Sequence, residues 1–455
     1  MRLCLDKAYN GAKKDDEGEK FFHAKRTTNC VKSLSRVKVA ILFQFVISST
    51  MKPIPFSPPR VDEKTIEAVT AVLRSGWITT GPQTRAFEED LRRYTQSGPV
   101  LCLNSWTNAV ELVLRWFGVK EGDEVLLPAY TYAATANIVM HVGAKPILVD
   151  SMLNSPLMDL EDAKSKLSAR TKVIMPVDIG GFPMDYDAVM ALSKSFSKQF
   201  KWEHPTEVQK QLGRPLVIAD AAHSFGAWYN GKQVGGQTDV MAFSFHAVKN
   251  LTTAEGGSVH LNLPAPFSND EIRASLNVSA LHGQTKDALS KTQAGNWRYD
   301  IVEAGYKCNM TDIHAAIGRV ELDRYEETLA RRKKICLKYH EIFQASGLNL
   351  SLPVFQSKNM ESSYHLYMLR INEFSEDQRD AVIRSVAEQG ISLNVHFQPL
   401  PLLSFYKNQG YQMEHYQNAW NLYANEISLP VYFDLSDDDV ERVAKSIIEA
   451  VKKIC

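Results

Sequence analysis

DVMAFSFHAVKNLTTAEGGSV, residues 239–259, is the stretch on which the fold of this chain depends. It begins with an apolar run at 240–243 that is typical of a buried strand. A Gly-Gly pair at 256–257 then indicates a turn before a second strand at 258–261. Lys249 lies between the two strands, soon after the first one ends. On its own, this stretch would favour the simpler interpretation of a surface lysine in a hairpin loop.

A second apolar run, PLVIA at 215–219, ends in Asp220 and continues as AAHSFG at 221–226. Open α/β sheets bind their ligands at the carboxyl ends of their strands, which is where this pattern places Asp220. Alone, Asp220 could equally be the N-cap of a helix. Together the two stretches match the core of the pyridoxal phosphate enzymes. In these enzymes a lysine holds the cofactor aldehyde as a Schiff base, and a carboxylate keeps the pyridine nitrogen protonated.

The sequence from about Ile54 to about Ala450 resembles the DegT-type (DegT/DnrJ/StrS) sugar aminotransferases, a branch of the fold-type I pyridoxal phosphate enzymes. The resemblance implies an α/β fold with two domains. The large one has a mostly parallel mixed sheet between helices, and the smaller C-terminal one is α+β. Six motifs carry the resemblance, in the order of the family: SGWITTGP (75–82), GDEVLLPAYTYAAT (122–135), ADAAHSFGA (219–227), SFHAVKNLTTAEGG (244–257), GYKCNMTDIHAAIG (305–318) and NEISLPVY (425–432).

The resemblance implies that Lys249 and Asp220 are the catalytic residues and that pyridoxal 5'-phosphate is the cofactor. Lys249 would hold the cofactor and, once released by the amino donor, would move a proton as general base and acid. Asp220 would keep the ring nitrogen protonated. His223 stands beside the ring hydroxyl, where many relatives have glutamine, and it can donate the same hydrogen bond.

The turn at 104–108 opens a helix after the strand at 100–103. Small hydroxyl residues at such a turn are usually caps, but a helix N-terminus is also a binding site for phosphate. In similar proteins this turn holds the cofactor phosphate, which implies that role for Ser105 and for the backbone of Trp106. The resemblance implies the same role for Ser244, in the motif at 244–257. The family usually has a small residue in place of Trp106.

The resemblance places an aromatic ring, that of Tyr132, over the face of the pyridine, where stacking adds roughly 1 kcal/mol. Otherwise Tyr132 is a core tyrosine at the head of a helix.

Five residues are candidates for the partner subunit or the substrate. In similar proteins the loop with Lys307 and Asn309 crosses the interface of a homodimer, and one of them reaches the neighbouring cofactor phosphate; otherwise the loop is solvated. Trp77 and Thr79 lie in a loop that lines the substrate entrance in the family. His396 lies where the family brings residues of the small domain to the sugar. Alternatively, Trp77 and Thr79 serve packing and a turn, and His396 is a structural histidine.

Composition excludes some partners. Lys and Arg number 52, as do Asp and Glu, so the net charge is zero and neither nucleic acid nor an acidic membrane surface is expected as a partner. The 6 cysteines show no CxxC spacing and the 12 histidines show no ligand spacing, so we expect reduced thiols, a cytoplasmic protein and no metal. An apolar run at 39–47 is too short for a membrane helix, which needs about 20 residues.

We expect a disordered or mis-assigned extension at 1–50, a large cofactor-binding domain at 51–320 and a small domain at 321–455. Alternating strands and helices between 100 and 261 indicate a parallel sheet with right-handed crossovers. Four segments carry more specific expectations: an exposed insert at 198–214, a helix at 311–329 that exposes Arg319, Glu321 and Arg324, a charged helix at 329–343, and a strand at 393–397.

The function implied is the transfer of an amino group from an amino acid, glutamate, to a nucleotide-linked keto sugar, in the biosynthesis of amino sugars or surface polysaccharides. Only the resemblance supports the sugar. Two alternatives stay open. One is a sugar dehydratase of the same fold, in which histidine replaces the lysine. The other is a non-catalytic regulator, which should have lost Lys249 or Asp220.

Overall fold

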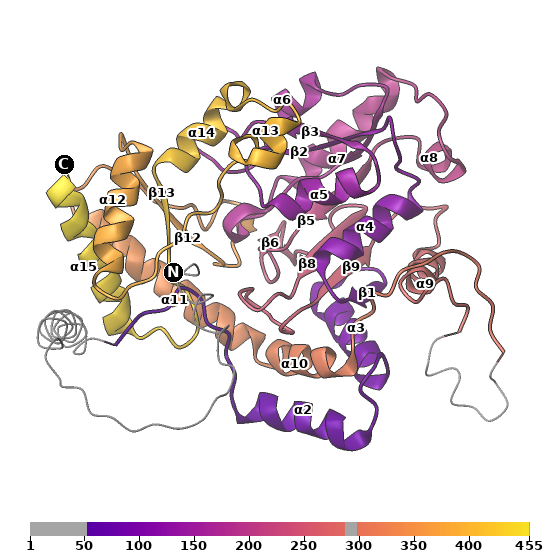
Figure 1. The fold of residues 1–455 in the computed structure, drawn as a ribbon, viewed down its shortest axis with the longest axis horizontal. Coiled ribbons are helices and arrows are strands. Elements are labelled where there is room, and N and C mark those ends of the chain that lie inside the picture. The colour runs from indigo at the N-terminus through magenta and orange to yellow at the C-terminus, as the bar shows by residue number, and fades with distance from the viewer. Residues whose placement is uncertain (1–51, 287–297, 455) are drawn as a thin grey trace, which may run out of the picture. The chain divides into compact units, whose positions relative to one another are not determined.

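A seven-stranded mixed sheet forms the centre of the chain in the computed structural model, which describes residues 52–286 and 298–454 (Figure 1). Its strands follow the order β1-β9-β8-β5-β4-β2-β3. All are parallel except β9, which runs antiparallel between β1 and β8. The strands are β1 (Val100–Leu103), β2 (Glu124–Pro128), β3 (Lys145–Val149), β4 (Thr171–Ile174), β5 (Leu216–Asp220), β8 (Val240–Ser244) and β9 (Gly257–Leu261).

Helices pack against both faces of this sheet, because alternate residues of each strand point to opposite sides. In β5, Leu216 and Ile218 enter one hydrophobic core, whereas Val217 and Ala219 enter the other. The first core also contains α4 (Trp106–Trp116), α5 (Ala133–His141), α8 (Glu207–Leu212), α9 (Asn269–Ser279), α13 (Ser404–Asn408) and α14 (Gln417–Ala424). The second contains α3 (Pro82–Thr95), α6 (Leu160–Ser165), α7 (Tyr186–Ser195) and α10 (Asp312–Asp323).

A smaller sheet near the C-terminus has the strand order β10-β12-β13. It has a hydrophobic core of its own. Its elements are β10 (Leu350–Ser351), β12 (Tyr367–Ile371), β13 (Glu426–Leu429), α11 (Tyr325–Ala345), α12 (Glu376–Ala387) and α15 (Asp437–Ile454). Elsewhere lie α2 (Glu63–Ser75) and a short sheet of β6 (Trp228–Tyr229), β7 (Lys232–Gln233) and β11 (Met360–Glu361). The mixed sheet and the helices on both faces confirm the predicted α/β class.

The domain limits stay predictions. Residues 1–50 lie outside the described part of the chain, and position 320 falls inside α10. Pro53–Cys455 make one compact unit. Among the helices that the structure describes, none combines the length and the apolar composition needed to cross a bilayer.

The predicted helix at 311–329 is wrong in its extent and in its surface. It is two helices, α10 and α11, which meet at Arg324. Arg324 is buried and pairs with Glu321 of α10 and with Asp62, the N-cap of α2. These charges therefore join elements of the fold, and only Arg319, which pairs with Asp90, stays at an accessible position.

The segment 198–214 is mostly exposed or half-buried, as expected, and it contains α8. Two side chains anchor it: Trp202 donates its indole N–H to the Thr171 carbonyl, 2.8 Å away, and Arg214 is buried against Asp239. One other expectation is wrong, because the segment 393–397 is not a strand: only Asn394 forms a bridge, with Ser428.

Candidate active site

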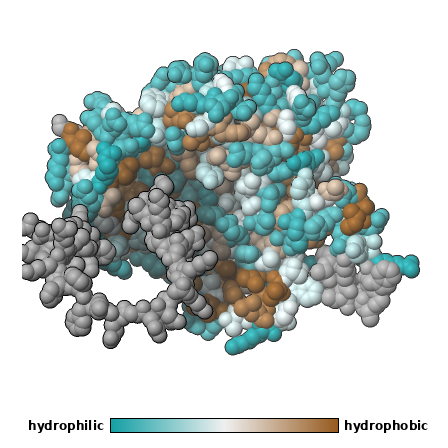
Figure 2. Space-filling view, in the orientation of Figure 1, coloured by the Kyte–Doolittle hydropathy of each residue, from teal (hydrophilic) through white to brown (hydrophobic). Residues whose placement is uncertain are grey.

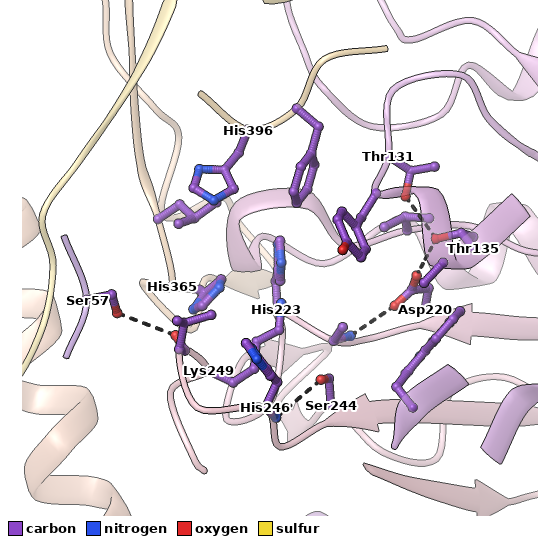
Figure 3. Close-up of a pocket in the computed structure, with 18 of the residues that line it drawn as sticks. Ser57, Thr131, Thr135, Asp220, His223, Ser244, His246, Lys249, His365 and His396 are labelled. Atoms are coloured by element: carbon purple, nitrogen blue, oxygen red, sulfur yellow. Dashed lines mark hydrogen bonds between the residues drawn. The ribbon is translucent and has the colours of Figure 1, made fainter. Parts of the chain in front are cut away.

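A cavity of about 540 Å³ opens at the carboxyl edge of the large sheet. Parallel strands end at the same edge, so the loops that follow β1, β2, β5 and β8 meet there. Figure 3 shows Thr135, Asp220 and Lys249 around the cavity. Eight of the predicted site residues line it: Ser105, Trp106, Tyr132, Asp220, His223, Ser244, Lys249 and His396.

Asp220, the last residue of β5, is buried and well held. Its Oδ2 accepts a hydrogen bond from Thr135 Oγ1 at 2.9 Å, and its Oδ1 accepts one from the Ala222 amide at 3.3 Å. Burial raises the pKa of Asp220 to about 6, against the lowering effect of Thr135, the Ala222 amide and Lys249. Thr135 was not predicted from the sequence, because a threonine in the first turn of α5 has no feature that points to a carboxylate.

Lys249 faces the same cavity as Asp220. Burial lowers its pKa to about 8, and the nearby Asp220 opposes this shift. The lysine sits in a loop that is closed by two backbone hydrogen bonds, from Phe245 to Gly256 and from Thr253 to Phe245, each 2.9 Å long. Gly256 is needed in this loop, because a Cβ atom there would lie 2.2 Å from Thr253 Oγ1. The sequence thus holds a readily neutralised amine beside a carboxyl group.

The first turn of α4 has the geometry of a helix start that can bind an anion. Ser105 is its N-cap, and Ser105 Oγ accepts a hydrogen bond from the Asn108 amide at 3.1 Å. The other N–H groups at the start of a helix have no partner within the helix, and the helix dipole favours negative charge there. Gly257 of β9 packs against this turn so closely that a Cβ atom would lie 2.2 Å from the Trp106 nitrogen. Ser244, the last residue of β8, lines the cavity as well.

Trp106 stands where the family usually has a small residue, and the hydrophobic core accommodates its larger side chain. Its side chain belongs to the hydrophobic core beneath α4 and is buried, while its backbone belongs to the first turn. The indole Nε1 is buried without a hydrogen-bond partner in the described residues. A large side chain at this position therefore leaves the helix start free to meet an anion.

Two histidines whose rings are in contact, His223 and His365, form the wall opposite Asp220 (Figure 3). Nδ1 of His223 accepts a hydrogen bond from the Gly180 amide at 3.2 Å, so its neutral ring carries the proton on Nε2. Burial, with Lys249 and His396, keeps the pKa of His223 well below its usual range. The ring of His365 lies 4.3 Å away, centroid to centroid. His365 was missed because it lies in an apolar run that predicts only a core strand.

Tyr132 and His396 face the open side of the cavity. Tyr132 precedes α5, is 63% exposed and contacts Phe397, with ring centroids 5.8 Å apart. The His396 ring stacks on Phe56 at 5.4 Å, and its Nδ1 lies 2.8 Å from Ser428 Oγ. Both side chains are placed to meet a molecule that enters from solvent.

The other four predicted residues do not line this cavity of the same chain. They lie together where the loops at 76–82 and 305–312 meet, and we call Trp77, Thr79, Lys307 and Asn309 the Asn309 patch. Asn309 Nδ2 donates to Thr80 Oγ1 at 2.6 Å, and Trp77 Nε1 donates to the Thr80 carbonyl at 3.2 Å. Lys307 donates to Asn309, and Thr79 accepts from the Asp312 amide at 3.2 Å.

An acid, an amine and an anion site around one cavity match the pyridine nitrogen, the aldehyde and the phosphate of pyridoxal phosphate. The fold and the site together define a fold-type I pyridoxal phosphate transferase. Residues 59–200 and 205–448 match the DegT/DnrJ/EryC1/StrS aminotransferase family. The chain belongs to this family and is a pyridoxal phosphate-dependent transaminase.

Known proteins resemble the chain over most of its length. The structure of the putative sugar aminotransferase Spr1654 from Streptococcus pneumoniae, in its PMP-form, superposes with a TM-score of 0.85 and 42% identity, covering 88% of this chain and 100% of that one. The uncharacterized protein MJ1066 of Methanocaldococcus jannaschii is 38% identical over 88% of this chain and 97% of its own length. The spore coat polysaccharide biosynthesis protein SpsC of Bacillus subtilis is 32% identical over the same shares.

Proposed function

We propose that this enzyme transfers an amino group from an amino acid, glutamate, to a keto sugar carried on a nucleotide, in the biosynthesis of amino sugars for surface polysaccharide. The observation that carries the transfer chemistry is the pair of Lys249 and Asp220 in one cavity, each with a pKa displaced toward neutrality. Two relatives support the sugar: Spr1654 is described as a putative sugar aminotransferase, and SpsC belongs to the biosynthesis of a polysaccharide.

Asp220 is the group we assign to the pyridine nitrogen. When bound, pyridoxal phosphate supplies a protonated ring that stabilises negative charge on the reacting carbon. Asp220 would keep this ring protonated, and the hydrogen bond from Thr135 holds the carboxylate in place. Ser105, Ser244 and the Trp106 amide would bind the phosphate. His223 would donate its Nε2 proton to the ring hydroxyl.

Lys249 is the group we assign to proton transfer. A lysine with an ordinary pKa of about 10.4 is almost entirely protonated at pH 7. Burial lowers the pKa of Lys249 to about 8, so its neutral form is accessible near physiological pH. The neutral amine could take a proton from the substrate carbon and then give it back, acting first as general base and then as general acid.

The substrate enters on the side of Tyr132 and His396. Tyr132 would stack on the face of the pyridine and exclude water from it. His396 presents a polar ring that can bind an oxygen of the sugar. The nucleotide would extend beyond the cavity toward solvent.

A homodimer with a site shared between subunits is part of this proposal. The Asn309 patch stands outside the cavity of its own chain and is available to a second copy, whose phosphate Lys307 or Asn309 would reach. Apolar surface gathers near the lower edge of the molecule in Figure 2, where Figure 1 places α2 and α10. Ile66, Leu73 and Ile78, in α2 and the loop after it, are each at least 50% exposed.

Neither a dehydratase nor a regulator is favoured by the site, because each would dispense with a group that is present. A dehydratase of this fold has histidine at the position of Lys249. A regulator would have no need to keep Lys249 and Asp220 together. The cytoplasmic location and the absence of nucleic acid, membrane and metal partners stay predictions.

The proposal is tested with a panel of nucleotide-linked keto sugars and glutamate, in which formation of 2-oxoglutarate is measured. We expect turnover with at least one sugar, no turnover by Lys249→Ala, and full turnover by Lys232→Ala, which changes an exposed lysine of β7. Wild-type protein that binds pyridoxal phosphate but aminates none of the sugars would refute the substrate class. Retained turnover by Lys249→Ala would refute the role of the lysine.

A further inference from the structure

The motif NEISLPVY at 425–432 has no part in the chemistry described so far, yet two of its side chains lie behind the cavity wall and contact His396, which lines the cavity. Glu426 and Ser428 alternate along β13 and so face the same side of that strand. Both are buried. Ser428 Oγ lies 2.5 Å from Glu426 Oε1 and 2.8 Å from His396 Nδ1. A carboxyl group, a hydroxyl group and an imidazole therefore form one continuous hydrogen-bonded chain.

The position of His396 is fixed by the same elements. Its amide donates to Glu426 Oε2 at 2.9 Å, and its carbonyl accepts from the Tyr130 hydroxyl at 2.6 Å. Its ring stacks on Phe56. Nε2 has no hydrogen-bond partner in the described parts of the chain, although His396 lines the cavity (Figure 3). The ring thus has one nitrogen committed to Ser428 and one left for a ligand.

The chain of three groups has two arrangements, because a hydroxyl group has a single proton to donate. When Glu426 is ionised, Ser428 donates to the carboxylate, so Nδ1 of the neutral ring must donate to Ser428 and Nε2 is an acceptor. When Glu426 is protonated, it can donate to Ser428. Ser428 then donates to Nδ1, and Nε2 carries the proton. One proton gained or lost at Glu426 therefore reverses the hydrogen-bonding role of Nε2.

We propose that Glu426 and Ser428 are positioning residues that set the tautomer of His396, and with it the ability of this histidine to donate a hydrogen bond to the substrate. This inference rests on the proposed function. A keto oxygen has only lone pairs, so it is bound by the form in which Nε2 carries a proton. The form of the chain in which Nε2 is an acceptor cannot bind this oxygen.

The charges around Glu426 decide which form is present. Burial raises the pKa of Glu426 to about 8, and Ser428, the His396 amide and Arg379 lower it less. Burial and the nearby Lys249 lower the pKa of His396 to about 3, so its ring is neutral. Below about pH 8 the proton is on Glu426 and Nε2 is a donor; above it, Nε2 becomes an acceptor.

Two further groups stand close to this carboxyl group. Arg370 of β12 lines a cavity of about 240 Å³ together with Glu426 and Tyr130. Arg379 is the cation that lowers the pKa of Glu426, and the Tyr130 hydroxyl, whose pKa burial raises well above its usual range, stays protonated throughout. Neither Arg370 nor Tyr130 supplies a second proton that could replace the one on Glu426.

The tautomer can be measured without substrate by nitrogen-15 NMR of the cofactor-loaded enzyme with labelled histidine. His396→Gln identifies the signal among the 12 histidines. We expect the wild-type signal to change from the Nε2-protonated to the Nδ1-protonated tautomer near pH 8. Glu426→Gln should stay Nε2-protonated at every pH, since its amide can donate to Ser428 but cannot lose a proton. Ser428→Ala should lose the transition, and Ser428→Thr should restore it.

Kinetics give a second readout that a purely structural role would not change. For the wild type, the KM for the keto sugar should rise roughly fivefold above pH 8, the effect of one lost hydrogen bond, with a smaller change in kcat. Glu426→Gln should abolish this rise. Ser446→Ala is the matched control, because it removes another buried hydroxyl, one that donates to Gln389 at 2.7 Å. This control should behave as the wild type in both measurements.

The two proposals fail separately. A His396 signal that titrates in Glu426→Gln as it does in the wild type would overturn the coupling. A tautomer change near pH 8 in a protein that aminates no keto sugar would support the coupling and refute the proposed function. A KM for the keto sugar that is unchanged in all variants, in an active enzyme, would overturn the role of His396 as a donor to substrate.

Discussion

Replacement of Asp220 by asparagine removes the charge that opposes the shift in the pKa of Lys249. In the wild type this pKa falls from 10.5 to about 8. The shift corresponds to about 3 kcal/mol, and it raises the neutral fraction at pH 7 from about one in three thousand to about one in ten. Because Asp220 raises the pKa of Lys249, Asp220→Asn should lower that pKa further. The amide keeps the size of the side chain and an oxygen that can accept from Thr135.

The assay is the rate at which the cofactor-free protein captures the aldehyde of pyridoxal phosphate, followed by absorbance between pH 6 and 10. Only the neutral amine attacks the aldehyde, so the rate should rise with pH and level off at the pKa of Lys249. We expect the plateau near pH 8 in the wild type and at a lower pH in Asp220→Asn. Turnover of this variant should also fall, because the ring nitrogen loses its partner.

Asp178→Asn is the matched control. Asp178 is also buried, and its pKa is likewise raised to about 6 by burial, but it has no part in the shift of Lys249. The plateau of this variant should stay near pH 8. An identical plateau in Asp220→Asn and in the wild type, or a wild-type rate that still rises at pH 10, would refute the electrostatic argument.

Three further changes test the fold and the cofactor site. Arg214→Leu should lower the free energy of unfolding by about 3–5 kcal/mol in urea titrations, because it leaves the buried carboxylate of Asp239 unpaired. Arg92→Ala, which removes the exposed pair with Glu89, should lower it by at most about 1 kcal/mol. Equal losses in the two variants would contradict this expectation. Gly257→Ala should release the cofactor on dialysis, because its Cβ would meet the start of α4, whereas Gly236→Ala, whose nearest contact would be 3.5 Å away, should retain it. His223→Gln should keep its turnover within about tenfold of the wild type, since an amide can replace one hydrogen bond; complete loss would show that the imidazole itself is required.

The position of the site could be predicted from the sequence because it depends on local patterns. Apolar runs that end in Asp220, or are followed by Lys249 and Ser105, mark strands and the edge at which they finish. Once the strands are parallel, these residues meet with little further information. The family motifs then supplied their roles, which remain proposals.

The residues that escaped prediction depend on contacts between distant segments. His365 meets His223 because Ser363 and Leu366 hydrogen-bond to the Gly180–Gly181 turn after β4. The pattern of residues at 364–371 therefore could not predict that His365 contacts His223. Arg324 has the composition of a helix surface, and only its pairing with Asp62, far along the chain, buries it.

The false strand at 393–397 has a comparable origin. Its apolar residues alternate as in a strand, but the His396 amide donates to the side chain of Glu426 instead of a neighbouring backbone carbonyl. The segment therefore leaves the sheet at the point where its histidine enters the cavity. A propensity scale cannot anticipate a backbone group whose partner is a buried side chain.

The order of the central strands sets a length requirement for whatever occupies the cavity. Between β1, which leads to Ser105, and β5, which ends at Asp220, lie only β9 and β8. Three inter-strand spacings separate the two anchoring points, about 14 Å in all. A vitamer without its phosphate can satisfy the carboxylate or approach the helix start, but it cannot span both. The enzyme should therefore discriminate against pyridoxal through the geometry of its backbone, however well the ring itself is recognised.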